Sequence, residues 1–141
     1  MLHVFAGTPR VGSFKDAGQA FGVLVESVDV LLGASWHDVT LDGVQDAIIM
    51  QVRSGEFDVV WIGTPCASCS VLWLEGDKAQ PRTRDEPDGA LGLPLWQRDY
   101  VRRHNGFIKF SARLARAALE AGATYVIENP VDYGMRGSPF Y

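Results

Sequence analysis

The chain has little cysteine, little net charge and no long apolar run, and each shortage excludes a class of protein. Two of the 141 residues are cysteine, too few and too close together for the disulfide framework of a secreted protein. A formal net charge of −4 argues against binding nucleic acid over the whole surface by charge, although a local basic strip is compatible with it. No apolar stretch approaches the roughly 20 residues of a membrane span, and residues 1–7 lack a basic leader segment. We therefore expect a cytoplasmic protein without a membrane partner.

The rest of the composition is that of one globular domain. Hydrophobic residues make up 47% and charged residues 21% of the sequence, which is ordinary for a protein with a buried core. The length favours a single domain over residues 1–141. Short apolar runs alternate with segments of helical spacing. This pattern predicts strands at residues 2–6, 23–30, 36–39, 58–62 and 124–127, and helices at residues 13–21, 44–53 and 95–121.

The alternation predicts an α/β fold, a Rossmann-like parallel sheet of about five strands with helices on both faces. Ligands of such sheets bind beyond the carboxyl ends of the strands, near the point where the strand order reverses. Residues with useful chemistry follow the five predicted strands: Gly7, Asp29, Asp38, Cys66 and Glu128. We therefore expect the functional site at this edge of the sheet.

Three of these strand ends suit a nucleotide. Residues 7–12, Gly-Thr-Pro-Arg-Val-Gly, let the backbone approach a ligand near a helix N-terminus, although an ordinary turn explains the segment equally well. A carboxylate such as Asp29 commonly accepts the hydroxyls of a ribose, with Glu26 as a rival, and Asp38 can accept from an adenine amino group. The alternative is that Asp29 is solvated and Asp38 caps or turns the chain.

The other two strand ends carry a thiol and a carboxyl group. Cys66 follows Pro65 at the mouth of the sheet, where a thiol with a lowered pKa is a nucleophile. Cys69 is expected to be buried packing, and no histidine has zinc-site spacing to the two cysteines, so no metal is expected. A redox pair of cysteines stays open, although its usual neighbours are missing. Glu128, if partly desolvated, can share a proton; otherwise it belongs to a turn set by the following Asn-Pro pair.

Basic residues and tryptophans gather in and after a long loop at residues 63–94. Arg82 and Arg84 can contact phosphates, but their acidic neighbours favour a solvated charged face. Trp73 and Trp96 can stack on bases or pack against the protein. A nucleic-acid strip is therefore one of two interpretations of this segment.

Taken in order, these motifs resemble those of the DNA cytosine-5 methyltransferase family, over nearly the whole chain. Residues 4–7, Val-Phe-Ala-Gly, are similar to its Phe-x-Gly cofactor loop, and residues 65–70, Pro-Cys-Ala-Ser-Cys-Ser, to its Pro-Cys-Gln-x-Phe-Ser nucleophile loop. Residues 127–129, Ile-Glu-Asn, resemble its Glu-Asn-Val strand end. Small phage and algal proteins of this type carry Glu-Asn-Pro, as this chain does.

The resemblance implies a methyltransferase-type fold and a defined chemistry. Cys66 would add to carbon 6 of a cytosine that has left the helix stack. Glu128 would hold the proton on ring nitrogen 3, so that carbon 5 takes a methyl group from S-adenosylmethionine. The implied cofactor-binding residues are Phe5, Gly7, Asp29, Asp38 and Pro65. The implied substrate-binding residues are Ser70, Arg84 and Asn129, and the implied partner is nucleic acid, DNA rather than RNA.

Three hypotheses about function follow. Cys66 and Glu128 favour a reduced DNA (cytosine-5)-methyltransferase. A catalytically inactive binding module that kept the fold is favoured by Pro9, which stands where the family has glycines in its cofactor loop. The family's target-recognition segment and last two strands are also missing, so the domain is expected to be incomplete at its C-terminus, or a partner chain supplies target recognition. The third hypothesis is a different thiol enzyme that uses Cys66 on a small substrate.

Overall fold

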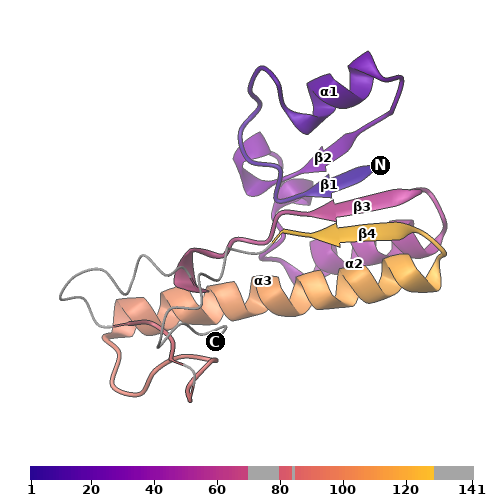
Figure 1. The fold of residues 1–141 in the computed structure, drawn as a ribbon. Helices are drawn as coiled ribbons and strands as arrows, with labels where there is room; N and C mark the ends of the chain where they lie inside the picture. Colours follow the sequence, from indigo (N-terminus) through magenta and orange to yellow (C-terminus); the bar gives the residue numbers. More distant parts are fainter. Residues whose placement is uncertain (70–79, 84, 129–141) are drawn as a thin grey trace. The chain divides into compact units, whose positions relative to one another are not determined.

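Two compact units make up the described part of the chain. The computed structural model describes residues 1–69, 80–83 and 85–128 (Figure 1). The sheet unit comprises residues 1–64 and 109–128, and the described residues of the loop unit lie within residues 65–108. Helix α3 (Leu95–Glu120) begins in the loop unit and ends in the sheet unit. Over the described ranges, no helix has both the length and the apolar character needed to cross a membrane.

The sheet unit is built on four parallel strands, which confirms the expected α/β class. They are β1 (Leu2–Val4), β2 (Glu26–Val28), β3 (Val59–Ile62) and β4 (Thr124–Ile127). Their order is β2-β1-β3-β4, and every adjacent pair is parallel. The strand order therefore reverses between β1 and β3, which is where ligands of such sheets bind.

The prediction of a fifth strand at residues 36–39 was wrong. Residues 35–37 form a short 3-10 helix, η2 (Ser35–His37), which follows a second one, η1 (Val30–Leu32). Trp36 is 70% exposed, and the Asp38 carboxylate accepts from the backbone N–H and the hydroxyl of Thr40. Such local side-chain bonds compete with a strand ladder. The described sheet consequently has four strands rather than about five.

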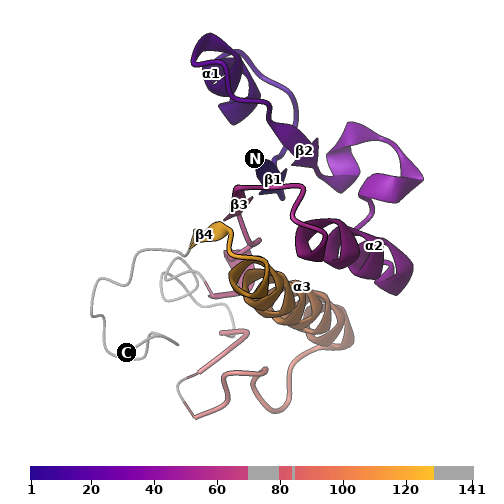
Figure 2. The same ribbon diagram turned by 90° about the vertical axis from the view of Figure 1, so that its right-hand side faces the viewer.

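One face of the sheet carries α2 (Asp42–Arg53) and the second half of α3 (Figure 2). The apolar spacing of both segments fits this arrangement, because residues three and four apart share one face of a helix. Gly106 does not interrupt α3. Two residues expected in its buried face, Ile108 and Leu119, are 40% and 67% exposed. The apolar helical residues that are buried here are Ile48, Ile49, Val52, Phe110, Leu114, Ala115, Ala117 and Ala118.

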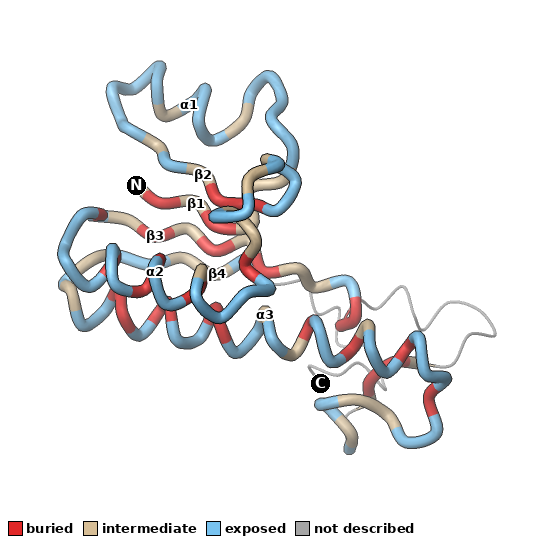
Figure 3. The backbone as a smooth tube through the Cα atoms, turned by 180° about the vertical axis from the view of Figure 1, so that it is seen from behind, coloured by how far each residue is buried: buried red, intermediate tan, exposed pale blue. Residues whose placement is uncertain are grey.

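The other side of the sheet carries α1 (Phe14–Ala20), a short helix with no buried residue (Figure 3). Ser13 caps it by accepting from the backbone N–H of Asp16. Phe14 makes the packing contacts of α1. The centroid of its ring lies 4.9 Å from that of His3 and 4.5 Å from that of Trp61. Helix α1 therefore covers this face much more loosely than α2 and α3 cover the first.

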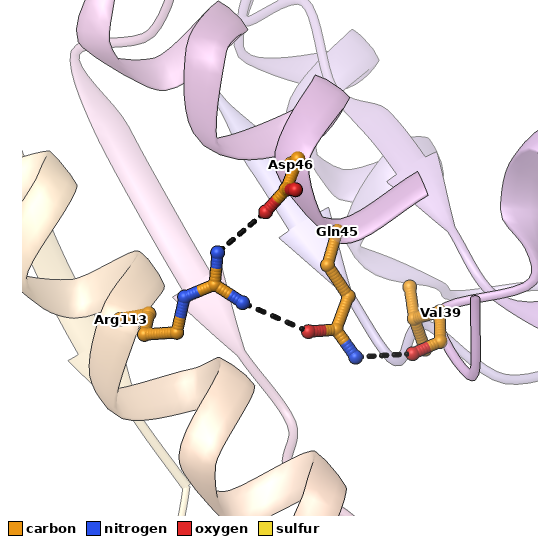
Figure 4. Close-up of polar contacts among 4 residues, drawn as sticks. All are labelled: Val39, Gln45, Asp46 and Arg113. Carbon is orange, nitrogen blue, oxygen red and sulfur yellow. Dashed lines mark hydrogen bonds and ion pairs between the residues drawn. The ribbon is translucent and has the colours of Figure 1, made fainter. Parts of the chain in front are cut away.

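A polar network joins the two larger helices to the segment after η2 (Figure 4). Arg113 of α3 donates to the side chains of Gln45 and Asp46 on α2. The buried Gln45 amide in turn donates to the Val39 carbonyl oxygen at 2.9 Å. This contact satisfies a backbone acceptor that no strand ladder covers, and it fixes the chain next to Asp38.

In the loop unit, the first half of α3 packs against the segment that precedes it in the chain. Residues 97, 101 and 104 are buried at helical spacing. The segment contains η3 (Ala67–Cys69), a short 3-10 helix that begins directly after Cys66. The predicted loop at residues 63–94 is therefore partly ordered around the thiols.

Candidate functional site

The backbone turns sharply after β1, at the reversal of strand order. Phe5 has φ 62°, a left-handed conformation that is uncommon for any residue other than glycine. Its N–H donates to the Val28 carbonyl oxygen at 2.8 Å, which keeps the turn against β2. Such backbone outliers collect at binding and catalytic sites. The strain coincides with the cofactor loop that the sequence predicts.

Asp29 fixes this turn from the end of β2. One carboxylate oxygen accepts from the Gly7 N–H and the other from the Leu31 N–H, each at 2.9 Å. The side chain is buried, with 8% exposed, so the interpretation of Asp29 as a solvated residue was wrong. Gly7 has φ 72°, which suits glycine. Asp29 therefore joins two strand ends that lie 22 residues apart.

Asp38 forms a local turn, as the alternative interpretation of this residue predicted. Its Oδ1 accepts from the Thr40 N–H at 3.0 Å and from the Thr40 hydroxyl at 2.6 Å. These two hydrogen bonds hold the pKa of Asp38 below its ordinary value. A role of Asp38 toward adenine stays a prediction.

A cavity of about 1010 Å³ opens beside this turn, on the side of the sheet that carries α1. Its walls include the segment of residues 6–16, part of β2, and His3, Leu32 and His37. Arg10 and Lys15 bring positive charge to the rim, whereas Asp29 and Asp38 are not part of the lining. The wall includes residues 7–12 and Glu26, which the sequence singled out, whereas no motif marked Leu24 or Leu32.

Two histidines of the cavity wall are partly shielded from water. Burial lowers the pKa of His3, an effect that the carboxylates of Glu128 and Asp29 partly oppose. The Nδ1 atom of His37 is buried without a hydrogen-bond partner among the described residues. A buried polar atom without a partner is uncommon in folded proteins and costs stability. Neither histidine stood out in the sequence except as a weak metal ligand.

Glu128 lies at the end of β4 and is directed toward the end of β3. Its Oε2 is 3.7 Å from the position that a Cβ atom on Gly63 would take, and the Phe5 carbonyl oxygen is 3.3 Å from it. The absence of a side chain at Gly63 therefore leaves room where β1, β3 and β4 end. Glu128 is exposed, so the expected partial desolvation of this carboxyl group is not found.

Pro65 and Cys66 belong to the loop unit. Cys66 is a half-buried free thiol and Cys69 a buried one, which confirms the expected packing role of Cys69. The Pro65 carbonyl oxygen accepts a hydrogen bond from the His104 side chain. Burial lowers the pKa of His104, and the positive charges of Arg82 and Arg103 add to this effect. The thiol segment is thus held to α3 by the His104 imidazole.

Arg82 is buried, with 4% exposed, so the interpretation of this residue as part of a solvated face was wrong. Its guanidinium donates to the Ser68 hydroxyl at 3.1 and 3.2 Å, and to the backbone carbonyl oxygens of Pro87 and Val101. A planar group with several donors can satisfy many acceptors at once. The sequence marked Arg82 only as a phosphate contact or a solvated residue, because its acidic neighbours pointed to solvent.

Three predicted substrate-binding residues, Ser70, Arg84 and Asn129, lie outside the described residues, as does Trp73. Trp96 is 65% exposed. Within the described ranges, no group of three or more His, Cys, Asp and Glu side chains gathers in a way that could hold a metal ion.

Comparison of the chain with protein families, with curated proteins and with solved structures finds no match. Its function is therefore inferred from the residues and geometry of the site.

Proposed function

We propose that the chain is a Rossmann-like, methyltransferase-type protein that binds S-adenosylmethionine and transfers its methyl group to a cytosine of DNA. The observation that carries this proposal is the turn after β1, which Asp29 fixes at the reversal of strand order and which borders a cavity of about 1010 Å³. Small-molecule sites commonly occupy about 300–1,000 Å³ and lie at this point of a parallel sheet.

The cavity wall suits the polar groups of S-adenosylmethionine. Arg10 and Lys15, which line the cavity, supply positive charge for a carboxylate. Glu26, the rival of Asp29 for the ribose role, contributes to the cavity wall. Asp29 acts instead as a positioning residue, since it holds Gly7 in place.

One reacting group is proposed in the loop unit and the other in the sheet unit. Cys66 is the only half-buried free thiol of the described chain, and it supplies the nucleophile for carbon 6 of the base. The exposed Glu128 carboxyl group holds the proton at ring nitrogen 3. S-adenosylmethionine supplies an electrophilic methyl group when bound.

Trapping on DNA that contains 5-fluorocytosine tests the proposal, because the fluorine at carbon 5 prevents release of the enzyme thiol. We expect a covalent complex with the intact chain in the presence of S-adenosylmethionine. Cys66→Ser abolishes the complex, whereas the matched Cys69→Ser variant retains it. Glu128→Gln slows trapping, and Glu120→Gln, which changes an exposed glutamate of α3, does not. A complex that survives Cys66→Ser contradicts the assigned nucleophile.

A binding module without transfer activity is the second candidate. It is favoured by the hydrogen bonds of Asp29, whose carboxylate bonds the backbone instead of lining the cavity. Binding of S-adenosylmethionine without any trapping on fluorinated DNA is the result that this candidate predicts.

A further inference from the structure

Two thiols share one turn of the loop unit. The Cys69 N–H donates to the Cys66 carbonyl oxygen at 2.8 Å and closes the 3-10 turn of η3. Such a turn rises about 2 Å per residue, so the two Cα atoms lie about 6 Å apart. Disulfides bridge Cα atoms separated by about 4.4–6.8 Å. The backbone is therefore already at a separation that a disulfide accepts.

The side chains around the turn indicate that both sulfur atoms lie in one small polar environment. Burial raises the pKa of Tyr100, and negative charge on Cys66 and on Cys69 raises it further. Both thiols are thus close enough to act on the same phenol. The Ser68 hydroxyl lies 3.8 Å from the Cys69 sulfur atom.

A buried positive charge completes this environment. Arg82 also acts on Tyr100, in the opposite direction to the two thiolates. Its guanidinium donates to the hydroxyl of Ser68, one of the two residues between the cysteines. A guanidinium and a hydroxyl group therefore lie beside the turn that carries the two thiols. These are the neighbours that the sequence alone did not reveal for a cysteine pair.

We propose that Cys66 and Cys69 form a redox-active dithiol, which hydrogen peroxide converts into an intramolecular disulfide. Cys66 reacts first, because it is half-buried whereas Cys69 is only 7% exposed. Its thiolate attacks the O–O bond, forms a sulfenic acid and releases hydroxide, which takes up a proton as water. The Cys69 sulfur atom then attacks the sulfenic sulfur. The S–O bond breaks, the S–S bond forms, and a second water leaves with the Cys69 proton.

The inference goes beyond the proposed function and does not depend on it. It uses residues of the loop unit alone and requires neither S-adenosylmethionine nor DNA. If Cys66 also acts as the nucleophile in methyl transfer, the disulfide blocks this thiol, and a dithiol reductant restores it.

Oxidation of the purified full chain tests the dithiol directly, because the sequence has no other cysteine. We expect hydrogen peroxide to lower the number of thiols that iodoacetamide labels from two to none. Intact mass spectrometry should show the loss of two hydrogen atoms, and dithiothreitol should restore both thiols. A disulfide between two chains, visible as a dimer on a non-reducing gel, contradicts the proposal.

Single-cysteine variants identify the order of the steps. Cys69→Ser lacks the resolving thiol, so the sulfenic acid at Cys66 persists and reacts with dimedone at least about tenfold more than in the intact chain. In Cys66→Ser, Cys69 stays unmodified at the same peroxide concentration. Equal dimedone labelling of the intact chain and Cys69→Ser overturns the proposal. Far-ultraviolet circular dichroism of each variant checks that it is folded.

Discussion

The two faces of the sheet differ in how completely they are covered. On the face that carries α2 and α3, the strand residues Leu2, Val4, Val60 and Ile62 are at most 1% exposed. On the opposite face, the strand residues that alternate with them are only half-buried, and α1 has no buried residue (Figures 2 and 3). This second set comprises His3, Ser27, Trp61 and Val126.

Because of this difference, one face of the sheet contributes to stability and the other leaves room for a ligand. Parallel sheets are usually apolar on both faces because helices cover both. Here the second face carries a histidine and a serine at adjacent positions, His3 opposite Ser27, and both line the cavity. Polar side chains at such positions cost stability unless a polar neighbour or ligand satisfies them. The face with α2 and α3 therefore supplies most of the stability, and the other face is available for a ligand.

The largest loss of stability is expected from truncating a large buried side chain on the face that carries α2 and α3. Phe110 is fully buried, and Phe110→Ala should lower the free energy of unfolding by about 3–5 kcal/mol. Trp61→Ala, on the half-buried face, should cost no more than about half as much. Urea denaturation followed by circular dichroism measures both. Equal costs would remove the distinction between the faces.

A smaller effect is expected from the carboxylate that fixes the turn after β1. Asp29→Ala leaves the N–H groups of Gly7 and Leu31 unpaired, so we expect a loss of about 2–3 kcal/mol in the free energy of unfolding. Asp38→Ala is the matched control and should cost clearly less, because Asp38 bonds only its neighbour Thr40. Similar losses in both variants would mean that Asp29 does not hold the turn.

The half-buried face should also give the protein a pH dependence. The pKa of His3 is lowered by burial, so between that pKa and the ordinary value of about 6.5 the unfolded chain binds a proton that the folded chain does not. The stability present above pH 6.5 is therefore lost as the pH falls below it. His3→Gln should reduce this slope. Glu128→Gln, which removes an opposing charge, should lower the pKa of His3 further in an NMR titration.

The smallest effect is expected from an ion pair at the surface of the helical face. Arg53 and Glu120 join α2 to α3 at 3.0 Å, but their side chains are 56% and 49% exposed. Arg53→Ala should change the free energy of unfolding by no more than about 1 kcal/mol, and less in high salt. A larger, salt-independent loss would show that charge, and not apolar burial, secures this face.

Elements with strong periodicity could be predicted from the sequence. The strand at residues 124–127 and the long helix agree with their predicted positions, because a short apolar run and a long stretch of helical spacing mark such elements. The strand expected at residues 36–39 does not exist, since the bonds of Asp38 with Thr40 favour a turn. Short segments of this kind are decided by local hydrogen bonds that spacing does not reveal.

The positions of the candidate site residues could be predicted better than their roles. Gly7 and Asp29 do meet at the carboxyl edge of the sheet, as strand alternation implied. The hydrogen bonds that occupy the Asp29 carboxylate could not be predicted, because they depend on how a distant turn folds back. Arg82 is the opposite case, since its charged neighbours suggested solvent whereas Ser68 and two carbonyl groups bury it.

Calorimetric titration of S-adenosylmethionine tests whether the half-buried face binds this cofactor. We expect one binding site per chain in the unmodified protein. Ser27→Leu fills the cavity wall and should weaken binding at least about tenfold. Ser35→Leu, which changes a serine outside the lining, should leave binding unchanged. No heat of binding with the folded, unmodified chain, or equal affinity in Ser27→Leu, would contradict the account.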